Sequence, residues 1–283
     1  MKRNLHLLVI DPQNDFCDLP AEALPGGAAP ALPVPGAHAD MQKVAGLVRR
    51  ALGGLTGISV TLDSHHRLDI AHPTFWTDAA GDAVPPFTQI SAADVRAGRY
   101  SPRDPAAKAR TLAYLDALEA AGRYTLMVWP VHCEMGTWGH EVHAEVQDAF
   151  DAWEQGGYGK VNQVVKGTNP WTEHYSAVLA EVPDPEDEST QLNASFIALL
   201  AQADRVYITG EAGSHCVKAT TEHLVDNLDP TQLSKLVLLT DCMSAVTGFE
   251  AQYHAFVADM AARGLQIATV ADVMPELLAN AQQ

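Results

Sequence analysis

The chain has 283 residues, 47% of them hydrophobic, and carries 35 acidic against 18 basic residues, a formal net charge of -17. Such a chain can bury a sizeable core, and no stretch approaches the roughly 20 apolar residues of a membrane span. An acidic surface repels phosphate backbones, so we expect neither a nucleic-acid nor a membrane partner. The N-terminus is typical of a first strand rather than a signal peptide, and four cysteines in this length do not make a disulfide framework. We therefore expect a cytoplasmic protein with free thiols.

Short apolar runs alternate with amphipathic, alanine-rich stretches along the chain. In chain order we expect strand Leu5–Ile10, helix Asp40–Leu52, strand Ile58–Leu62, helix Ala106–Ala121, strand Tyr124–Trp129, helix His140–Trp153, strand Asn162–Val165, helix Asn193–Gln202, strand Arg205–Thr209, helix Val217–Asn227, strand Leu236–Thr240, helix Glu250–Arg263 and strand Gln266–Thr269. This alternation predicts an α/β fold with three α-β-α layers, in which helices cover both faces of a mostly parallel sheet.

Two segments between these elements are rich in proline, glycine or alanine and are predicted to be loop insertions, Ala21–Gly36 and Phe75–Pro105. Loops of this length are often functional lids, although they can be plain surface insertions. The simplest organisation is a single domain that spans residues 1–283.

Chemically able side chains follow five successive predicted strands. Asp11 and Asp63 follow the first two, His132 follows the third after Trp-Pro, Lys166 follows the fourth, and Cys216 comes shortly after the fifth. Ligand sites of open parallel sheets form at the edge where the carboxyl ends of the strands lie. Each residue alone could be a cap or turn residue. Together they favour a functional site at that edge.

Cys216 is the best candidate for a nucleophile. A strand leads into a glycine-containing turn, and a helix begins at or near this cysteine. A helix N-terminus favours a thiolate and offers N–H groups to an oxyanion. Asp11 would be the proton acceptor and Lys166 the counter-charge that nucleophilic catalysis needs. A lone cysteine is more often a small buried hydrophobe, and the other three lack this setting.

One carboxylate and up to three imidazoles form a candidate metal site. Asp63 and His65 flank Ser64, His72 follows seven residues after His65, and His132 comes from the next strand end. This ligand set suits one divalent transition metal, zinc first and iron or manganese next, better than calcium or magnesium. In an extended segment the neighbouring His66 would point the opposite way. Three further histidines are assigned to a helix or a loop and left outside the site: His140, His143 and His174.

Several short motifs occur in a fixed order: Asp11-Pro12-Gln13-Asn14-Asp15-Phe16, Asp63-Ser64-His65, His72-Pro73-Thr74-Phe75, Trp129-Pro130-Val131-His132-Cys133, Lys166-Gly167, Tyr175-Ser176-Ala177 and the segment around Cys216. Together they resemble the nicotinamidase and pyrazinamidase branch of the isochorismatase-like cysteine hydrolases, from residue 5 to about 250. The resemblance implies the isochorismatase-like hydrolase fold and hydrolysis of nicotinamide, or a similar small aromatic carboxamide, to the acid and ammonia in pyridine nucleotide salvage. It allows a homo-oligomer.

The resemblance also assigns residues to roles. It implies a catalytic triad of Asp11, Lys166 and Cys216. It implies the metal ligands Asp63, His65, His72 and His132, and a substrate pocket lined by Phe16, Trp129 and Tyr175. It implies an oxyanion hole from the N–H groups of Ala212 and Cys216, with a cis peptide between Glu211 and Ala212. The chain departs from the family at Glu211-Ala212-Gly213-Ser214, where a small apolar residue and Ala-Thr-Asp are usual, and in its longer span from His72 to His132.

On this interpretation Asp11 takes the thiol proton, Cys216 attacks the carboxamide carbon, ammonia leaves, and water hydrolyses the thioester. The metal would bind the pyridine nitrogen, directly or through water, and orient the ring. Three alternatives stay open. The metal site could be the catalyst with Cys216 structural, the substrate could be another small amide, or the chain could be a non-catalytic binding protein that keeps the scaffold.

Overall fold

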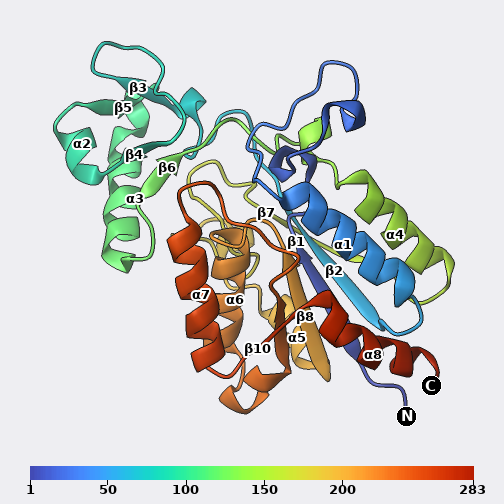
Figure 1. Ribbon diagram of the computed structural model, residues 1–283. Helices are drawn as coiled ribbons and strands as arrows, with labels where there is room; N and C mark the ends of the chain where they lie inside the picture. Colours follow the sequence, from blue (N-terminus) through green and yellow to red (C-terminus); the bar gives the residue numbers. More distant parts are fainter.

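A parallel sheet of six strands, in the order β10-β9-β8-β1-β2-β7, forms the centre of the computed structural model, which describes residues 1–283 (Figure 1). Its strands are β1 (Leu5–Ile10), β2 (Gly57–Asp63), β7 (Asn162–Lys166), β8 (Arg205–Gly210), β9 (Leu236–Leu239) and β10 (Gln266–Ala268). Every pairing in it is parallel. All six residues of β1 are buried, as expected for a central strand covered on both faces.

Helices cover both faces of this sheet, so the three-layer α/β prediction is confirmed. The helices of the sheet region are α1 (Ala37–Arg50), α4 (Ala144–Gln155), α5 (Ala194–Ala201), α6 (Cys216–Asn227), α7 (Glu250–Ala262) and α8 (Val270–Ala281). Helix α1 packs against α4 and α8 on one side, and α6 packs beside α7 on the other (Figure 1). Helix α8 was not expected. It begins with a capping box between Thr269 and Asp272 and continues through Pro275.

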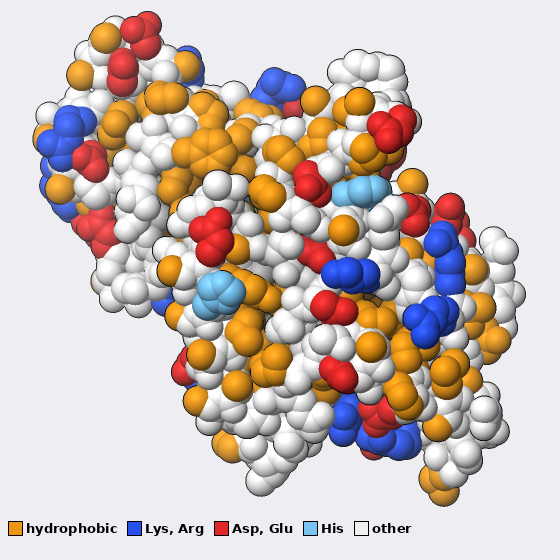
Figure 2. All heavy atoms as spheres, in the orientation of Figure 1, with side chains coloured by type: hydrophobic (Ala, Val, Ile, Leu, Met, Phe, Trp, Pro, Cys, Tyr) orange, Lys and Arg blue, Asp and Glu red, His pale blue; other side chains and the backbone are white.

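The remaining short helices are 3-10 turns at Asn14–Phe16, Ala21–Ala23, Pro73–Phe75, Pro105–Ala107, Trp138–His140, Glu188–Thr190 and Pro230–Lys235. Helix α4 therefore begins later than the predicted His140. No helix is both long and apolar enough to cross a bilayer. Acidic side chains are scattered over the face shown in Figure 2 rather than gathered in one patch.

The predicted strand at Tyr124–Trp129 exists, but its expected place in the central sheet is wrong. It is β6 (Leu126–Val128), which pairs antiparallel with β4 (Thr88–Ile90) in a separate two-stranded sheet. His132 therefore does not follow a strand of the central sheet. An apolar run predicts a strand, but it does not say which partner the strand will pair with.

The expected loop Phe75–Pro105 belongs to a structured lobe that projects from the sheet region, which we call the inserted lobe (residues 73–128; Figure 1). It contains β3 (Trp76–Asp78), β4, α2 (Ala92–Arg96), β5 (Tyr100–Pro102), α3 (Lys108–Ala121) and β6. Strand β3 pairs antiparallel with β5. The lobe is built around a second cluster of 13 buried apolar residues, all from the lobe except Ile70 just before it, beside the main cluster of 59. Apolar side chains in this segment thus form a small core that the loop prediction did not foresee.

Candidate functional site

Three neighbouring strands of the sheet bring two acids and a lysine together. Asp11 follows β1, while Asp63 and Lys166 end β2 and β7 and face each other in register. Lys166 Nζ lies 2.9 Å from Asp11 Oδ2 and 2.9 Å from Asp63 Oδ1. All three residues are buried. The common sheet edge therefore places these predicted site residues in direct contact.

Thr61 holds both the carboxylate and the backbone N–H of Asp11. Thr61 Oγ1, on β2, donates to Asp11 Oδ1 over 2.5 Å, and the Asp11 N–H donates to Thr61. Asp11 has a φ of 43°, in the left-handed region that aspartate tolerates better than most residues. Burial raises the pKa of Asp11 above its ordinary value, although Lys166 opposes the shift. A carboxylate with a raised pKa is suited to accept a proton and return it.

Cys216 is the first residue of α6 and lies beside this acid and lysine. Its Sγ is 3.6 Å from Lys166 Nζ, which is itself in contact with Asp11. Burial raises the pKa of the Cys216 thiol well above its ordinary value, Lys166 lowers it, and Asp11 raises it again. A raised pKa favours the protonated thiol, so attack by this sulfur would require a base.

The loop from β8 to α6 places backbone donors beside the sulfur. The peptide between Glu211 and Ala212 is cis, as expected. The N–H groups of Ala212 and Cys216 donate to no other group of the protein, and both residues line one pocket. Gly210 makes the loop possible, because it has a φ of 118° and a Cβ there would lie 2.0 Å from the Ile10 carbonyl oxygen. The two free N–H groups are available to an oxyanion in that pocket.

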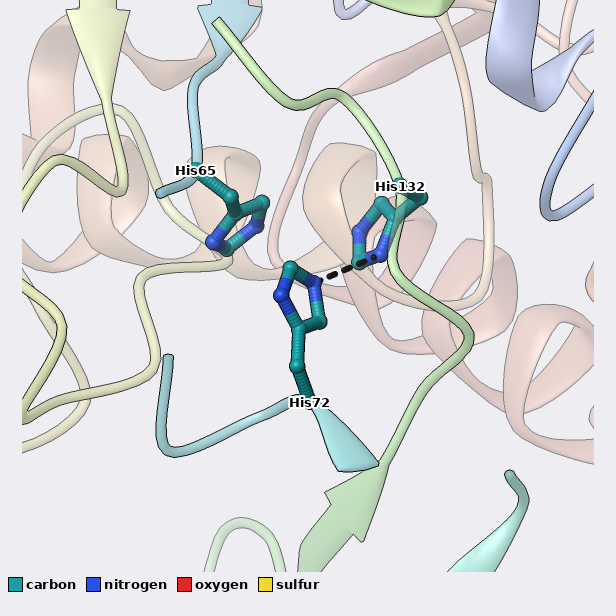
Figure 3. A group of neighbouring side chains, drawn as sticks. All are labelled: His65, His72 and His132. Carbon is teal, nitrogen blue, oxygen red and sulfur yellow. Dashed lines mark hydrogen bonds between the residues drawn. The ribbon is translucent and has the colours of Figure 1, made fainter. Parts of the chain in front are cut away.

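Three buried histidines converge on one point beside these residues (Figure 3). The ligand nitrogens of His65, His72 and His132 all lie within 4.8 Å of one another, and His72 Nε2 is 3.2 Å from His132 Nδ1. Asp63 Oδ2 lies 3.0 Å from His65 Nε2 and 3.3 Å from His132 Nε2. The neighbouring His66 is exposed. The structure thus brings the four predicted ligands together.

The donor set fits a divalent transition metal. The outer ring nitrogen of His65 contacts Asp69 at 3.0 Å, the arrangement that orients a metal-binding imidazole. Burial and the neighbouring imidazoles lower the pKa of His72 to about 2, so this ring is neutral and keeps a lone pair for a metal. Burial alone would raise the pKa of Asp63, but His65 and Lys166 hold it well below its ordinary value. Imidazoles with one carboxylate are typical ligands of zinc, iron or manganese.

Cys216 and two of the candidate metal ligands, Asp63 and His132, open onto the same pocket, which is lined by Phe16, Leu32, Asp63, Trp129, His132, Glu173, Tyr175, Ala212, His215, Cys216 and Val246. The predicted aromatic residues are all present, and Trp129 Nε1 donates to Tyr175 Oη over 3.0 Å. The free volume is about 20 Å³, room for about one water molecule. Side chains of the pocket must therefore move to admit an aromatic ring.

Sequence reasoning missed two polar residues that support the site. Gln13 joins β1 to β2, since its amide oxygen accepts from Asp63 N at 2.7 Å and its nitrogen donates to Asp63 O at 2.7 Å. Because Gln13 lies within the first motif of the chain, the sequence did contain a signal for its role. Glu173 is a buried pocket residue whose Oε2 has no partner, and burial raises its pKa to about 7. Nothing in the sequence distinguishes Glu173 from a surface acid.

The histidines left outside the site lie around it. His140 Nε2 contacts Ser64 Oγ at 2.7 Å, and the His174 carbonyl accepts from Lys166 Nζ at 3.1 Å. His143 pairs with His38 at 2.9 Å, outside the pocket. His215, next to the nucleophile, was also overlooked and forms part of the pocket wall against Trp129 and other rings.

Solved structures share this architecture. The yeast nicotinamidase Pnc1p is 20% identical, with a TM-score of 0.62 over 93% of this chain and 99% of that one. The pyrazinamidase of Pyrococcus horikoshii, in complex with zinc, is 21% identical, with a TM-score of 0.53 over 94% and 99%. An isochorismatase-like hydrolase from Alkaliphilus metalliredigens is 16% identical, with a TM-score of 0.52 over 96% and 98%. The chain has the isochorismatase-like hydrolase fold.

No family model matches the sequence, and no curated protein does. At these identities the isochorismatase-like structures establish the fold, while the chemistry rests on the residues of the pocket. The likeness extends over nearly the whole of each chain, which means that the sheet edge carrying the site belongs to the shared architecture.

Proposed function

We propose that this protein is an amidase that hydrolyses nicotinamide, or a similar small aromatic carboxamide, to the carboxylic acid and ammonia. One observation carries the proposal. Cys216 Sγ lies 3.6 Å from Lys166 Nζ, which is itself 2.9 Å from Asp11, and the pocket that Cys216 lines is also lined by two of the proposed metal ligands, Asp63 and His132. A thiol with a base, a cation and free N–H donors is suited to acyl transfer.

In the first half-reaction Asp11 takes the Cys216 proton and the sulfur attacks the carboxamide carbon. A C–S bond forms, and the negative oxygen is stabilised by the N–H groups of Ala212 and Cys216. Asp11 then gives its proton to the nitrogen, the C–N bond breaks, and ammonia leaves a thioester behind. Lys166, in contact with both groups, stabilises the negative charge as it moves between the carboxylate and the sulfur.

In the second half-reaction a water molecule replaces ammonia in the pocket. Asp11 takes a proton from this water, whose oxygen attacks the thioester carbon. The C–S bond breaks, the carboxylic acid is released, and the proton on Asp11 returns to the sulfur. One carboxylate thus acts as base and acid in both halves, which its raised pKa favours.

The residues of the pocket support a proposal for both the metal ion and the class of substrate. Asp63, His65, His72 and His132 would hold one divalent ion, zinc in the first instance. When bound, that ion supplies a Lewis acid that fixes a heteroaromatic nitrogen. The zinc in the Pyrococcus pyrazinamidase and the nicotinaldehyde inhibitor in a yeast nicotinamidase structure support this proposal. The aromatic side chains around Cys216 favour a flat ring over an aliphatic chain.

A cytoplasmic location and a place in pyridine nucleotide salvage are parts of the same proposal. The nucleophile is one of four free thiols, and a reducing compartment keeps thiols in that form.

The test is ammonia release from nicotinamide, pyrazinamide and aliphatic amides, measured on the wild type and on Cys216→Ala. We expect a preference for the aromatic amides and a loss of at least about a thousandfold in the variant. Cys242→Ala, which alters a buried cysteine away from the pocket, is the matched control and should retain activity. Full activity in Cys216→Ala would remove the thiol mechanism, and a preference for aliphatic amides would remove the substrate assignment.

A further inference from the structure

A second buried acid stands directly before the proposed oxyanion hole. Glu211 is completely buried, at the position where the resemblance expects a small apolar residue. Its Oε2 accepts from Ser244 N at 3.2 Å, and Ser244 Oγ donates to Asp40 Oδ2 at 2.5 Å. Asp40 is buried on α1, so Ser244 links two buried carboxyl groups behind the pocket wall, and Glu211 Oε1 has no hydrogen-bond partner.

The contacts of the two acids show which of them is charged. Asp40 has Lys43 Nζ at 3.6 Å and the Ser244 hydroxyl as donors, whereas Glu211 has only a backbone N–H and no cation. Two buried carboxyl groups in contact do not both ionise. Glu211, which is fully buried without a cation, is therefore assigned as the protonated partner. Burial and the charge of Asp40 raise the pKa of Glu211 well above its ordinary value, in agreement with this assignment.

Ser244 connects this acid pair to the loop that carries the oxyanion donors. It binds the Glu211 side chain through its N–H, and its carbonyl accepts from Gly213 N at 2.7 Å. The Glu211 N–H is also held, by the Ile10 carbonyl at 2.8 Å. Ala212 lies between these two anchored residues, and its own N–H donates to nothing in the protein. The direction of that N–H depends on the anchors on either side.

We propose that Glu211 is a positioning residue of the proposed amidase, which in its protonated form holds the Ala212 N–H toward the developing oxyanion and on ionisation releases it. This inference rests on the proposed function. It predicts that activity falls on the alkaline side as Glu211 loses its proton, because a second negative charge then faces Asp40.

The surroundings give that second charge little compensation. The titratable groups around the pair are Asp40 and Lys43 on α1, Cys17 and Asp18 after the first 3-10 turn, Asp241 and Cys242 after β9, and Tyr253 on α7. Lys43 is the single cation among them, and its side chain is 47% exposed. The pKa values of Cys17, Cys242 and Tyr253 are all raised, so these groups stay neutral while Glu211 titrates. Ionised Glu211 would therefore face mainly other negative charges.

The experiment compares kcat and KM of the wild type, Glu211→Gln and Glu211→Ala between pH 6 and 10. We expect Glu211→Gln to keep kcat within about threefold at pH 7, because its amide is neutral, has nearly the same shape and can still accept from Ser244 N, and to extend the alkaline limb. We expect Glu211→Ala to lower kcat by about tenfold to a hundredfold with little change in KM, as when an oxyanion donor is partly lost. Glu276→Gln, on α8 and away from the pocket, should match the wild type.

An alkaline limb at the same pH in Glu211→Gln and the wild type would overturn the inference, as would a wild-type kcat in Glu211→Ala. Thermal unfolding of the wild type and Glu211→Gln over the same pH range separates this inference from the proposed function. If Glu211 is the protonated partner, the Gln variant gains stability relative to the wild type as the pH rises, whether or not any amide is hydrolysed. A constant difference across the range would overturn the proton assignment.

Discussion

The sheet region and the inserted lobe are built differently and contribute differently to the site. The sheet region has six parallel strands and a buried apolar cluster of 59 residues, whereas the lobe has two antiparallel strand pairs and a cluster of 13. Asp11, Asp63 and Lys166 all come from strand ends of the sheet, and Cys216 opens a helix packed on it. The lobe itself contains none of these residues, but it leaves the sheet region just after His72 and returns just before Trp129.

The two ends of the lobe meet beside the metal cluster. Trp129 N donates to the Ala71 carbonyl at 2.7 Å, and His72 contacts His132 at 3.2 Å although 60 positions separate them in the sequence. The length of the intervening segment therefore has no bearing on the geometry of these two ligands. The comparison indicates that acid, lysine and thiol belong to the sheet, while the metal cluster is assembled where lobe and sheet join.

The largest expected effect is the loss of metal and activity in a variant whose Cys216 thiol stays reactive. His132→Ala should lose its divalent metal and at least about a thousandfold in activity, because a Lewis acid contributes several kcal/mol. Metal content and ammonia release measure this loss. Iodoacetamide should still alkylate Cys216 in the His132→Ala variant, since the residues around the sulfur come from the sheet edge. His66→Ala, at the exposed neighbouring position, should match the wild type. If His132→Ala kept its metal, the ligand assignment would be wrong.

The second prediction asks whether the two regions unfold together. Leu115 on α3 is fully buried in the lobe cluster, and Leu115→Ala should cost about 2–5 kcal/mol. We propose that residues 1–283 form one domain, so calorimetry should show a single transition at lower temperature. Leu224→Ala, a fully buried change on α6 in the main cluster, is the matched variant and should lower the same transition. A separate early transition in Leu115→Ala alone would mean that the lobe is an independent domain.

The third and smallest effect concerns the contact between the regions. Arg123, at the end of the lobe's α3, is 2.9 Å from Glu222 on α6 and 4.0 Å from buried Glu181. Burial raises the pKa of Glu181 to about 7, while Arg123 opposes the shift. The stability that protonated Glu181 provides is complete below about pH 4.5 and is lost as the pH rises to about 7, up to about 3 kcal/mol.

The Glu181→Gln substitution should remove this loss of stability at higher pH. Denaturant unfolding should therefore show little difference from the wild type at pH 5 and a more stable variant at pH 8. Glu186→Gln, an exposed change nearby, serves as the control and should show no such pH dependence. An equal effect of Glu181→Gln at both pH values would contradict the assignment of a raised pKa to this group.

The sequence allowed prediction of the sheet and of two lobe elements, α3 and β6, but not of the lobe as a unit with its own strand pairs. Strands such as Leu5–Ile10 are apolar apart from His6, which predicts burial on both faces. Leu126–Val128 has the same character, yet it pairs with β4, because apolar character does not select a partner. Helix α8 could have been found, since the Thr269 and Asp272 capping box is visible in the sequence.

The candidate site likewise contains residues that the sequence allowed us to predict and residues that it did not. Asp11, Asp63 and Lys166 were predictable because strand ends of a parallel sheet share an edge. His132 reaches the site by another route, through the return from the lobe, so strand order did not explain its position. Glu173 and Thr61 carried no signal, because their roles depend on how a loop and a neighbouring strand pack around them. The catalytic and ligand roles themselves remain predictions.

The hydrogen bond between Trp129 and Ala71 makes the lobe a replaceable module. Since the chain departs and comes back at adjoining points, a short turn could substitute for the whole excursion without displacing either flanking imidazole. The length and content of this excursion could therefore change while the candidate site beneath it keeps its geometry.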